Sequence, residues 1–249
     1  MSGRTVTAAV IIIGNEILSG RTQDANLAFL AQELGEIGVR LREARVVADE
    51  EDAIVEAVNA CRARYDHVFT TGGIGPTHDD ITSAAIATAF QRAHRRHPEA
   101  ERRLRAYYPP EKLNEARLKM ADMPEGAELI DNPVSVAPGF RIENVYVLPG
   151  VPSILQAMFA GLKPRLEGGA PVRSRTVTVL CPEGEIAKPL GEIQSRHPSI
   201  EIGSYPFMQQ GRFGTSLVFR GTDETAIRAA AEELLTLARE RRIEVLQLF

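Results

Sequence analysis

A regular alternation of strand and helix patterns over the first two thirds of the chain is the feature that most constrains the fold. The run from Val6 to Ile13 is apolar or β-branched at every position, which is typical of a strand buried on both faces of a sheet. We predict strands at residues 6–13, 41–47, 67–70 and 145–148, and amphipathic helices at residues 27–37, 53–61, 84–90 and 154–162. Successive β-α-β units connect by right-handed crossovers. The sequence therefore predicts an α/β domain with a mostly parallel sheet and helices on both faces.

The pattern changes after residue 168. Residues 167–171, Glu-Gly-Gly-Ala-Pro, have the composition of a linker. We therefore expect an α/β domain over residues 1–168 and a small α+β domain over residues 172–249. In the second domain we predict strands at residues 172–180, 200–204 and 215–220, a hairpin connection at 209–214, a helix at 185–196 and a last helix capped by Thr222.

Charge and composition exclude several classes of partner. The formal net charge is −4, whereas nucleic acids and anionic membranes bind basic surfaces. Residues 211–214, Gly-Arg-Phe-Gly, match the GXXG signature of KH modules, but that signature joins two helices, and here it lies between two predicted strands. Basic residues gather only between Arg92 and Arg105, as a solvated helix surface or as an anion-facing patch. We expect neither a nucleic-acid nor a membrane partner.

The two cysteines and the one long apolar run predict a cytoplasmic protein. Cys61 and Cys181 are 120 residues apart and belong to no C-x-x-C motif, so they indicate neither a zinc site nor a disulfide framework. Cys61 falls on an apolar helical stripe, which favours packing in the core. The uninterrupted apolar run from Ala8 to Ile13 is too short for a signal peptide or a membrane span.

A Gly-rich segment from Thr70 to Asp80, Thr-Thr-Gly-Gly-Ile-Gly-Pro-Thr-His-Asp-Asp, leaves a predicted buried strand and enters a predicted helix. Its glycines allow positive φ and close approach of the backbone, so that successive N–H groups converge on an oxyanion. The positive end of the following helix adds to this attraction. The spacing fits neither the Walker A motif nor G-x-G-x-x-G. The segment predicts a site for a phosphate-bearing ligand.

Two adjacent carboxylates, Asp79 and Asp80, lie in the same segment and would repel a bare phosphate. A divalent cation between carboxylates and phosphate removes this conflict, and oxygen ligands of this kind suit Mg²⁺ or Mn²⁺. The alternative is that one of the two caps the following helix and the other faces solvent. His78 is a candidate hydrogen-bonding or acid–base group, although a single histidine in a loop is more often neither.

Three other segments follow predicted strands, so we expect them at the same edge of the sheet. Gly14-Asn15-Glu16 follows the first strand, Asp49-Glu50 the second, and Pro149-Gly150-Val151-Pro152 the later one. Asp49 is either the cap of the next helix or a further carboxylate for metal and ligand.

These motifs resemble the molybdopterin-binding-like domain of competence/damage-inducible protein A and of eukaryotic FAD synthase. The resemblance rests on Gly14 to Gly20 with Asp24 and Asn26, on Val46 to Glu50, on Thr71 to Thr82, on Ala137 to Phe140, on Leu148 to Pro152 and on Gly203 to Pro206. It covers nearly the full chain. Ser135 and Ile154 depart from the competence-protein pattern, and the chain ends without room for the amidase or FAD-forming domains of longer members. We therefore expect both of those activities to be absent.

The resemblance implies hydrolysis of a nucleotide pyrophosphate bond, in ADP-ribose or FAD, with release of AMP. It also implies a divalent cation (Mg²⁺, Mn²⁺ or Co²⁺), K⁺ as an optional second cation, and a homo-oligomer, either a dimer or a trimer. The alternatives are molybdopterin adenylylation in cofactor synthesis and nucleotide or pterin binding without catalysis. Together with the residue chemistry above, the resemblance assigns Asp80 and Asp49 as metal-binding and catalytic carboxylates and Asp79 as a catalytic helper. It assigns the phosphate loop to Thr71, Gly72, Gly73, Gly75, Thr77 and His78. Further ligand-binding positions are Gly14, Asn15, Glu16, Asp24, Asn26, Pro149 and Gly150.

Overall fold

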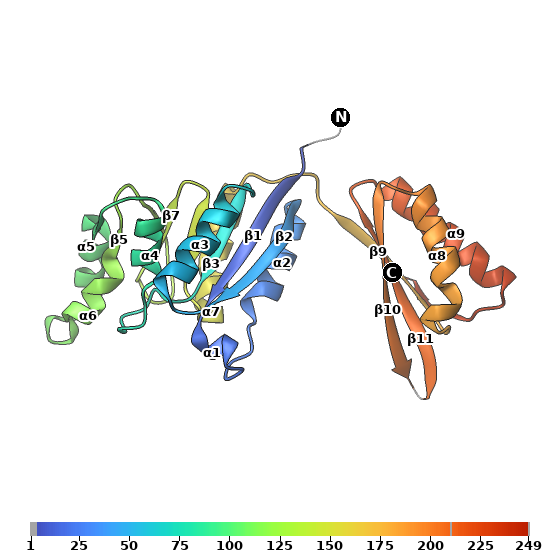
Figure 1. Cartoon of the computed structure of the whole chain (residues 1–249), viewed down its shortest axis with the longest axis horizontal. Coiled ribbons are helices and arrows are strands. Elements are labelled where there is room, and N and C mark those ends of the chain that lie inside the picture. Colours follow the sequence, from blue (N-terminus) through green and yellow to red (C-terminus); the bar gives the residue numbers. More distant parts are fainter. Residues whose placement is uncertain (1–3, 210, 249) are drawn as a thin grey trace. The chain divides into compact units, whose positions relative to one another are not determined.

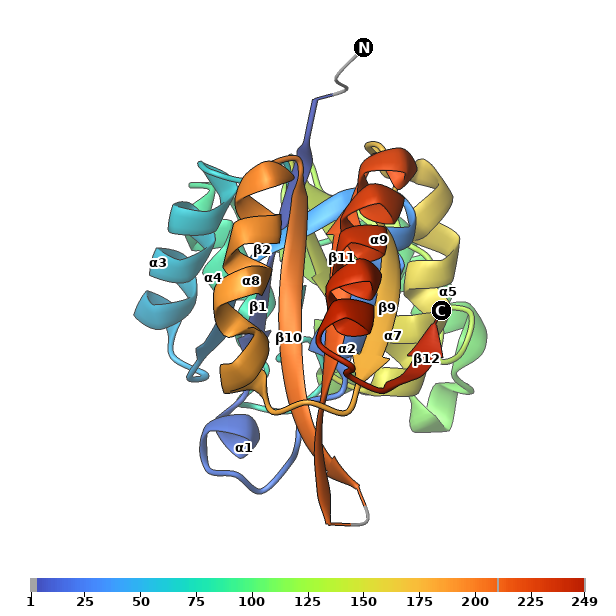
Figure 2. The same ribbon diagram turned by 90° about the vertical axis from the view of Figure 1, so that its right-hand side faces the viewer.

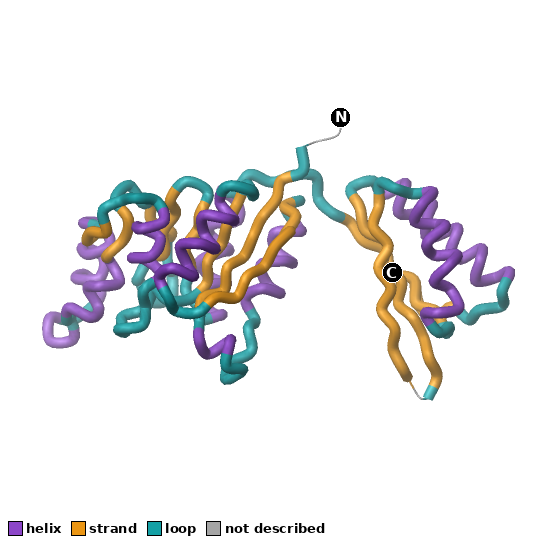
Figure 3. The backbone as a smooth tube through the Cα atoms, in the orientation of Figure 1, coloured by secondary structure: helices purple, strands orange, loops and turns teal. Residues whose placement is uncertain are grey.

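The computed structural model describes residues 4–209 and 211–248, and the chain divides into two compact units, Met1–Gly169 and Ala170–Phe249. Figure 1 shows the elements of both units along the chain, and Figure 3 distinguishes helices, strands and loops. Each unit has its own sheet and its own apolar core.

The first unit is built on a six-stranded sheet of order β2-β1-β3-β8-β7-β6. Its strands are β1 Val6–Ile13, β2 Val39–Val47, β3 His67–Thr71, β8 Val145–Leu148, β7 Gly139–Ile142 and β6 Glu128–Ile130. The first four strands of this order are parallel, whereas β7 and β6 continue the sheet in antiparallel pairs. The predicted mostly parallel sheet is confirmed.

Helices cover both faces of this sheet because alternate strand residues point to opposite sides. On one face, α3 (Glu51–Arg62), α4 (Thr82–Ala89) and α5 (Pro98–Tyr107) share a core with Ile11 and Val147, and Cys61 is fully buried in it, as predicted. On the other face, α2 (Asn26–Glu36) and α7 (Pro152–Leu162) pack against Ile12, Phe69 and Leu148.

Several short elements of the first unit were not predicted. They are β4 His94–Arg96, β5 Asp122–Pro124, β6, β7, α1 Asn15–Leu18 and the 3-10 turn η3 Lys163–Arg165. The polar sequence of residues 98–122 predicts helix in two pieces broken at Pro109-Pro110, and α5, η1 Pro110–Lys112, α6 Glu115–Leu118 and η2 Lys119–Ala121 lie there. Elements of three or four residues are too short to show a period of two or of 3.6 residues.

On α5, Arg102, Arg103 and Arg105 pair with Glu99, Glu101 and Asp131, so this stretch is an ion-paired helix surface and not an anion site.

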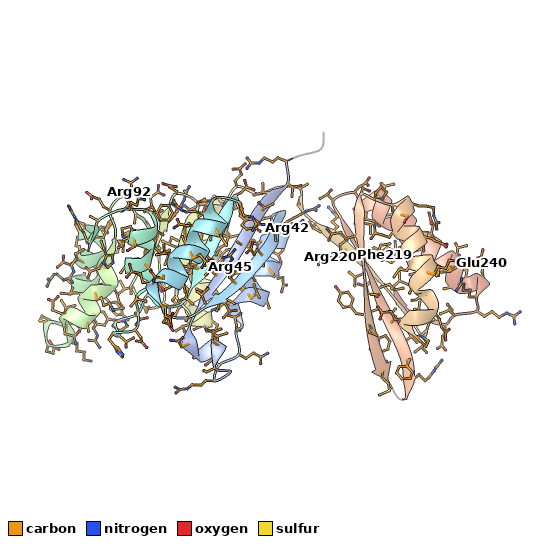
Figure 4. All side chains as sticks on the ribbon, viewed as in Figure 1. Arg42, Arg45, Arg92, Phe219, Arg220 and Glu240 are labelled. Carbon is orange, nitrogen blue, oxygen red and sulfur yellow. The ribbon has the colours of Figure 1, made fainter. Side chains whose placement is uncertain are left out.

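The second unit is an antiparallel sheet of order β10-β11-β9-β12 with two helices on one face (Figure 2). Its elements are β9 Arg173–Val179, α8 Glu183–Arg196, β10 Ile200–Gln209, β11 Arg212–Gly221, α9 Glu224–Glu240 and β12 Val245–Leu248. The alternation of faces is visible in β11, where Phe219 is fully buried while Arg220, its neighbour in the chain, is exposed (Figure 4). The predicted small α+β domain is thus an antiparallel sheet with two helices.

Three details of the second unit correct the sequence predictions. Strands β10 and β11 are longer than predicted and pair as far as Gln209 and Arg212, so only two residues connect them; of these, Gln210 lies outside the described residues. The N-cap of α9 is Asp223 and not Thr222, because the Asp223 carboxylate accepts hydrogen bonds from the N–H groups of Thr225 and Ala226. Strand β12, which joins the sheet beside β9, was not predicted.

A helix that is long and apolar enough to cross a membrane is not found in residues 4–209 and 211–248.

Candidate functional site

The carboxyl ends of β1, β2, β3 and β8 lie at one edge of the first sheet, as parallel strands require. Backbone hydrogen bonds tie the loops that follow them: Gly14 N–H donates to the Val47 carbonyl at 3.2 Å, and Gly72 N–H to the Leu148 carbonyl at 3.1 Å. The chain runs from β1 to β2 on one side and then to β3 on the other side of β1. This reversal places a crevice between the loops of β1 and β3, where open α/β sheets bind their ligands.

Two glycines let the loop after β3 approach β1 closely. Gly72 has φ +104°, and a Cβ atom there would overlap the carbonyl oxygen of Ile13, the last residue of β1. Gly73 has φ +66°, and a Cβ atom there would overlap the hydroxyl of Thr82. Thr82 is fully buried and donates to the Gly72 carbonyl from its hydroxyl and to the Gly73 carbonyl from its N–H, each at 3.0 Å. The loop is therefore fixed between β1 and the start of α4.

The backbone N–H groups of Gly73, Ile74 and Gly75 donate no hydrogen bond to any part of the chain that the structure describes. All three residues are half-buried. Since these residues are only half-buried, water can pair with the three donors until an acceptor from outside the chain replaces it. Consecutive N–H groups on a loop of this kind favour an anion.

Asp80 stabilises the loop in which it lies. Its carboxylate accepts hydrogen bonds from the Thr77 N–H at 2.8 Å and from the Thr77 hydroxyl. Helix α4 begins at Thr82 with Ile81 as its N-cap, and no side chain caps it. The alternative that Asp79 or Asp80 caps this helix is therefore wrong.

Asp79 and His78 lie at the exposed tip of the loop. The Thr77 side chain, and then the N–H of Asp79 itself, hold the pKa of the Asp79 carboxyl below its usual range. Since one hydroxyl carries one proton and Thr77 donates it to Asp80, Asp79 is a second acceptor within reach and not a simultaneous partner. The His78 side chain is 98% exposed, with Nδ1 4.0 Å from Asp79, and so has no buried contact that would orient it as an acid or base.

Lys119 brings a positive charge to this loop, which sequence reasoning missed. It belongs to η2, 42 residues further along the chain, and its Nζ donates to the Thr77 carbonyl at 2.5 Å. No local pattern marks it, because it lies in a polar stretch with other basic residues. The role of Thr82 in fixing the glycine loop was also not predicted.

Asp49 lies on the far side of β1 from the glycine loop. Its carboxylate accepts the N–H of Asn15 at 2.7 Å, which joins the loops of β2 and β1. The N-cap of α3 is Glu50, so the alternative that Asp49 caps this helix is wrong. Because β1 lies between β2 and β3, the ends of these two strands are about 10 Å apart. Asp49 and Asp80 thus flank the crevice.

A small cavity of ≈ 60 Å³ adjoins the crevice and collects five predicted residues. Glu16, Asp24, Asn26, Thr71 and Gly150 line it. Asn26 is 97% buried (3% exposed) and donates from Nδ2 to the Gly150 carbonyl at 2.8 Å, whereas its Oδ1 has no partner. Asp24 also accepts the N–H of Leu27 at 2.8 Å, at the start of α2. Pro149 is half-buried directly after β8.

Over residues 4–209 and 211–248, no group of three or more His, Cys, Asp or Glu side chains is arranged to hold a metal ion. The predicted carboxylates therefore do not form a closed protein cage. Magnesium is commonly held by one or two carboxylates together with waters and substrate phosphates, and the crevice offers carboxylates of that number on its two sides.

Comparison with known proteins shows the family to which the chain belongs. Residues 9–168 match the family described as probable molybdopterin binding domain. The chain belongs to the molybdopterin-binding domain family. Residues 171–246 match a second family, described as FAD synthase, middle domain. The resemblance read from the loop motifs is confirmed.

Relatives of two kinds match this family member. A protein of Aeropyrum pernix is 37% identical in an alignment that covers 94% of this chain and 92% of the relative. A CinA-like protein of Desulfosudis oleivorans is 36% identical over 79% of this chain, and a probable FAD synthase of Caenorhabditis elegans is 34% identical over 94% of it. This chain spans 51% and 49% of the length of those two relatives.

A solved structure supports the fold of the first unit. The protein CinA of Thermoplasma acidophilum, with a TM-score of 0.62 and 35% identity, covers 65% of this chain and 99% of its own length.

Proposed function

We propose that this chain binds a nucleotide pyrophosphate at the crevice between β1 and β3 and hydrolyses its pyrophosphate bond, releasing AMP from an ADP-ribose or FAD type of substrate. The observation that carries the proposal is the set of unpaired N–H groups of Gly73, Ile74 and Gly75 at the topological switch point. The relationship to probable FAD synthases supports a substrate that contains adenine nucleotide.

The residues of the loop bind the negatively charged part of this substrate. The three amides donate to phosphate oxygens and stabilise charge that develops on them during attack at phosphorus. Lys119, held on the Thr77 carbonyl, places an ammonium beside the same loop and attracts the phosphates. Asp80 keeps the loop closed through Thr77, so that the amides are arranged before the substrate arrives.

Carboxylates on either side of the crevice fit a hard divalent cation, which is why we propose Mg²⁺, Mn²⁺ or Co²⁺ as a cofactor. Asp80 on one side and Asp49 on the other would hold it together with phosphate oxygens and coordinated waters, and Asp79 is a further carboxylate of the same loop. When bound, such a cation neutralises phosphate charge and makes a coordinated water more acidic. His78, whose side chain is almost fully exposed at the tip of the loop, stays a candidate ligand-binding residue.

The test is release of AMP from ADP-ribose and from FAD with each of the three cations and with a chelator. The substitution Asp80→Asn retains an acceptor for the Thr77 N–H but removes the charge. We expect it to lower AMP release at least about 100-fold while the melting temperature stays close to that of wild type. Asp52→Asn, an exposed carboxylate in the first turn of α3, is the matched control and leaves the rate unchanged. Equal activity of Asp80→Asn and wild type, or no AMP with any cation, refutes hydrolysis at this site.

One observation favours a second function, the adenylylation of molybdopterin. The family that matches residues 9–168 is described by pterin binding. This function predicts turnover of molybdopterin with ATP and Mg²⁺ and no AMP from FAD or ADP-ribose. Tight binding of either ligand with no turnover at all indicates instead a binding protein without catalysis.

A further inference from the structure

The cavity beside the crevice contains an unsatisfied acceptor. Asn26 must present Nδ2 to the Gly150 carbonyl, since a carbonyl accepts only from the amide NH₂, and this fixes Oδ1 as the atom without a partner. A buried carbonyl oxygen that makes no hydrogen bond is unfavourable and rare. Asn26 is the first residue of α2 and its side chain lines the cavity, so this orphan indicates a donor supplied from outside the chain.

The rest of the cavity wall combines polar side chains with apolar ones, and its charged groups are all carboxylates. Glu16 and Asp24 contribute carboxylates, Thr22 and Thr71 hydroxyls, Gln23 an amide and Gly150 its backbone, while the lining contains no Lys, Arg or His. Two carboxylates with no cationic side chain beside them repel phosphate and favour a neutral group that donates hydrogen bonds. By the same measure of volume, a single water needs about 10–15 Å³, so ≈ 60 Å³ admits more than one hydroxyl group but excludes an aromatic ring system.

The cavity adjoins the glycine loop directly. Gly150 lines the cavity, and a Cβ atom added to it would lie 3.3 Å from the Cα of Gly72. A ligand with phosphates on the N–H groups of Gly73 to Gly75 therefore places its neighbouring sugar at the mouth of the cavity. In a nucleotide, the group directly attached to the phosphates is ribose, whose 2′ and 3′ hydroxyls are both donors.

We propose that this cavity is the ribose subsite of the nucleotide, where Asn26 Oδ1 and the Glu16 and Asp24 carboxylates accept the 2′ and 3′ hydroxyls. The proposal rests on the proposed function, because it takes the glycine loop as the phosphate site. It adds a selectivity: the chain prefers ribonucleotides to 2′,3′-dideoxynucleotides, and the preference arises from acceptors and not from the phosphate loop.

Equilibrium binding without turnover tests the proposal. AMP, 2′,3′-dideoxy-AMP and inorganic pyrophosphate are titrated into the full chain in a calorimeter. Wild type is expected to bind AMP about tenfold or more tightly than the dideoxy compound, since buried acceptors reject a ligand that lacks their donors. Asn26→Ala and Glu16→Gln reduce this ratio towards one and leave pyrophosphate binding within about twofold. Glu56→Gln, an exposed glutamate on α3, is the matched control and retains the full ratio.

The outcomes separate the two proposals. Equal affinity of wild type for AMP and dideoxy-AMP, with normal pyrophosphate binding, overturns the ribose subsite and leaves the phosphate site standing; a cavity that holds only a cation gives this result. Absence of binding by all three ligands overturns both. If Asn26→Ala unfolds because it also loses the bond to Gly150, the ligand series on wild type and Glu16→Gln still decides.

Discussion

Gly72 is the position at which one methyl group should disturb both the stability and the site. Its φ of +104° disfavours any L side chain, and a Cβ atom would overlap the Ile13 carbonyl, a backbone atom that cannot rotate away. We expect Gly72→Ala to cost about 1–2 kcal/mol for the left-handed backbone. Separating the ends of β1 and β3 to admit the methyl costs a further 1–3 kcal/mol or so, as overpacking does.

Gly126→Ala is the matched control for this prediction. Gly126 also has a positive φ, +86°, but a Cβ atom there meets nothing within 4 Å, so only the backbone cost of about 1–2 kcal/mol applies. Both glycines lie in the first unit, so the separate core of the second unit affects both measurements equally. Any gain from stiffening the unfolded chain is also shared.

The assay is urea unfolding followed by far-UV circular dichroism, combined with pyrophosphate titration. Gly72→Ala is expected to be about 1–3 kcal/mol less stable than Gly126→Ala and to bind pyrophosphate more weakly, because the free amides follow directly in the chain. Equal losses in the two variants would show that contact with Ile13 does not hold the loop. Unchanged pyrophosphate binding in Gly72→Ala would remove the argument that the close approach forms the site.

Two further predictions concern residues that local patterns did not identify. Lys119→Met should weaken pyrophosphate binding about three- to tenfold, and the loss should be smaller at high salt because the attraction is electrostatic. The control Lys112→Met, which changes an exposed lysine in η1, should bind pyrophosphate as wild type does. Equal affinities of Lys119→Met and wild type would exclude Lys119 from the site. Asp223→Ala should lower the free energy of unfolding of the second unit by about 1 kcal/mol, because it removes the α9 cap, and Thr222→Ala should leave that free energy unchanged. A larger drop in melting temperature for Thr222→Ala than for Asp223→Ala would contradict the cap assignment.

In the first unit, sequence patterns predicted the long strands and helices but not the short ones. The buried run Val6–Ile13 and the helices with apolar stripes were predicted at nearly their observed bounds, because burial on a sheet imposes a periodicity on the sequence itself. The glycines of the loop were also interpreted correctly, since the positive φ at Gly72 and Gly73 favours that residue type. Strands β4 to β7 were not, because three or four residues carry no readable period.

The hydrogen-bond partners of the site residues could not be predicted from the sequence. Whether Asp49, Asp79 or Asp80 caps a helix was undecidable from sequence, since a cap and a free carboxylate have the same neighbours in the chain. In the structure, the Asp49 carboxylate accepts a hydrogen bond from the N–H of Asn15, and the Asp80 carboxylate accepts one from the N–H of Thr77. Lys119 reaches Thr77 across 42 residues, a contact for which the sequence holds no signal.

The sequence by itself thus determined the element types, the place of the glycine loop after a buried strand and the family, all of which depend on neighbours in the chain. Only the tertiary structure decided the strand order β2-β1-β3-β8, and with it the crevice between β1 and β3. It also decided which polar atoms stay unpaired, among them the Gly73 to Gly75 amides and Asn26 Oδ1. The physical reason is that a hydrogen bond is satisfied or left open by whatever lies a few ångströms away, and for these atoms that is a different part of the chain.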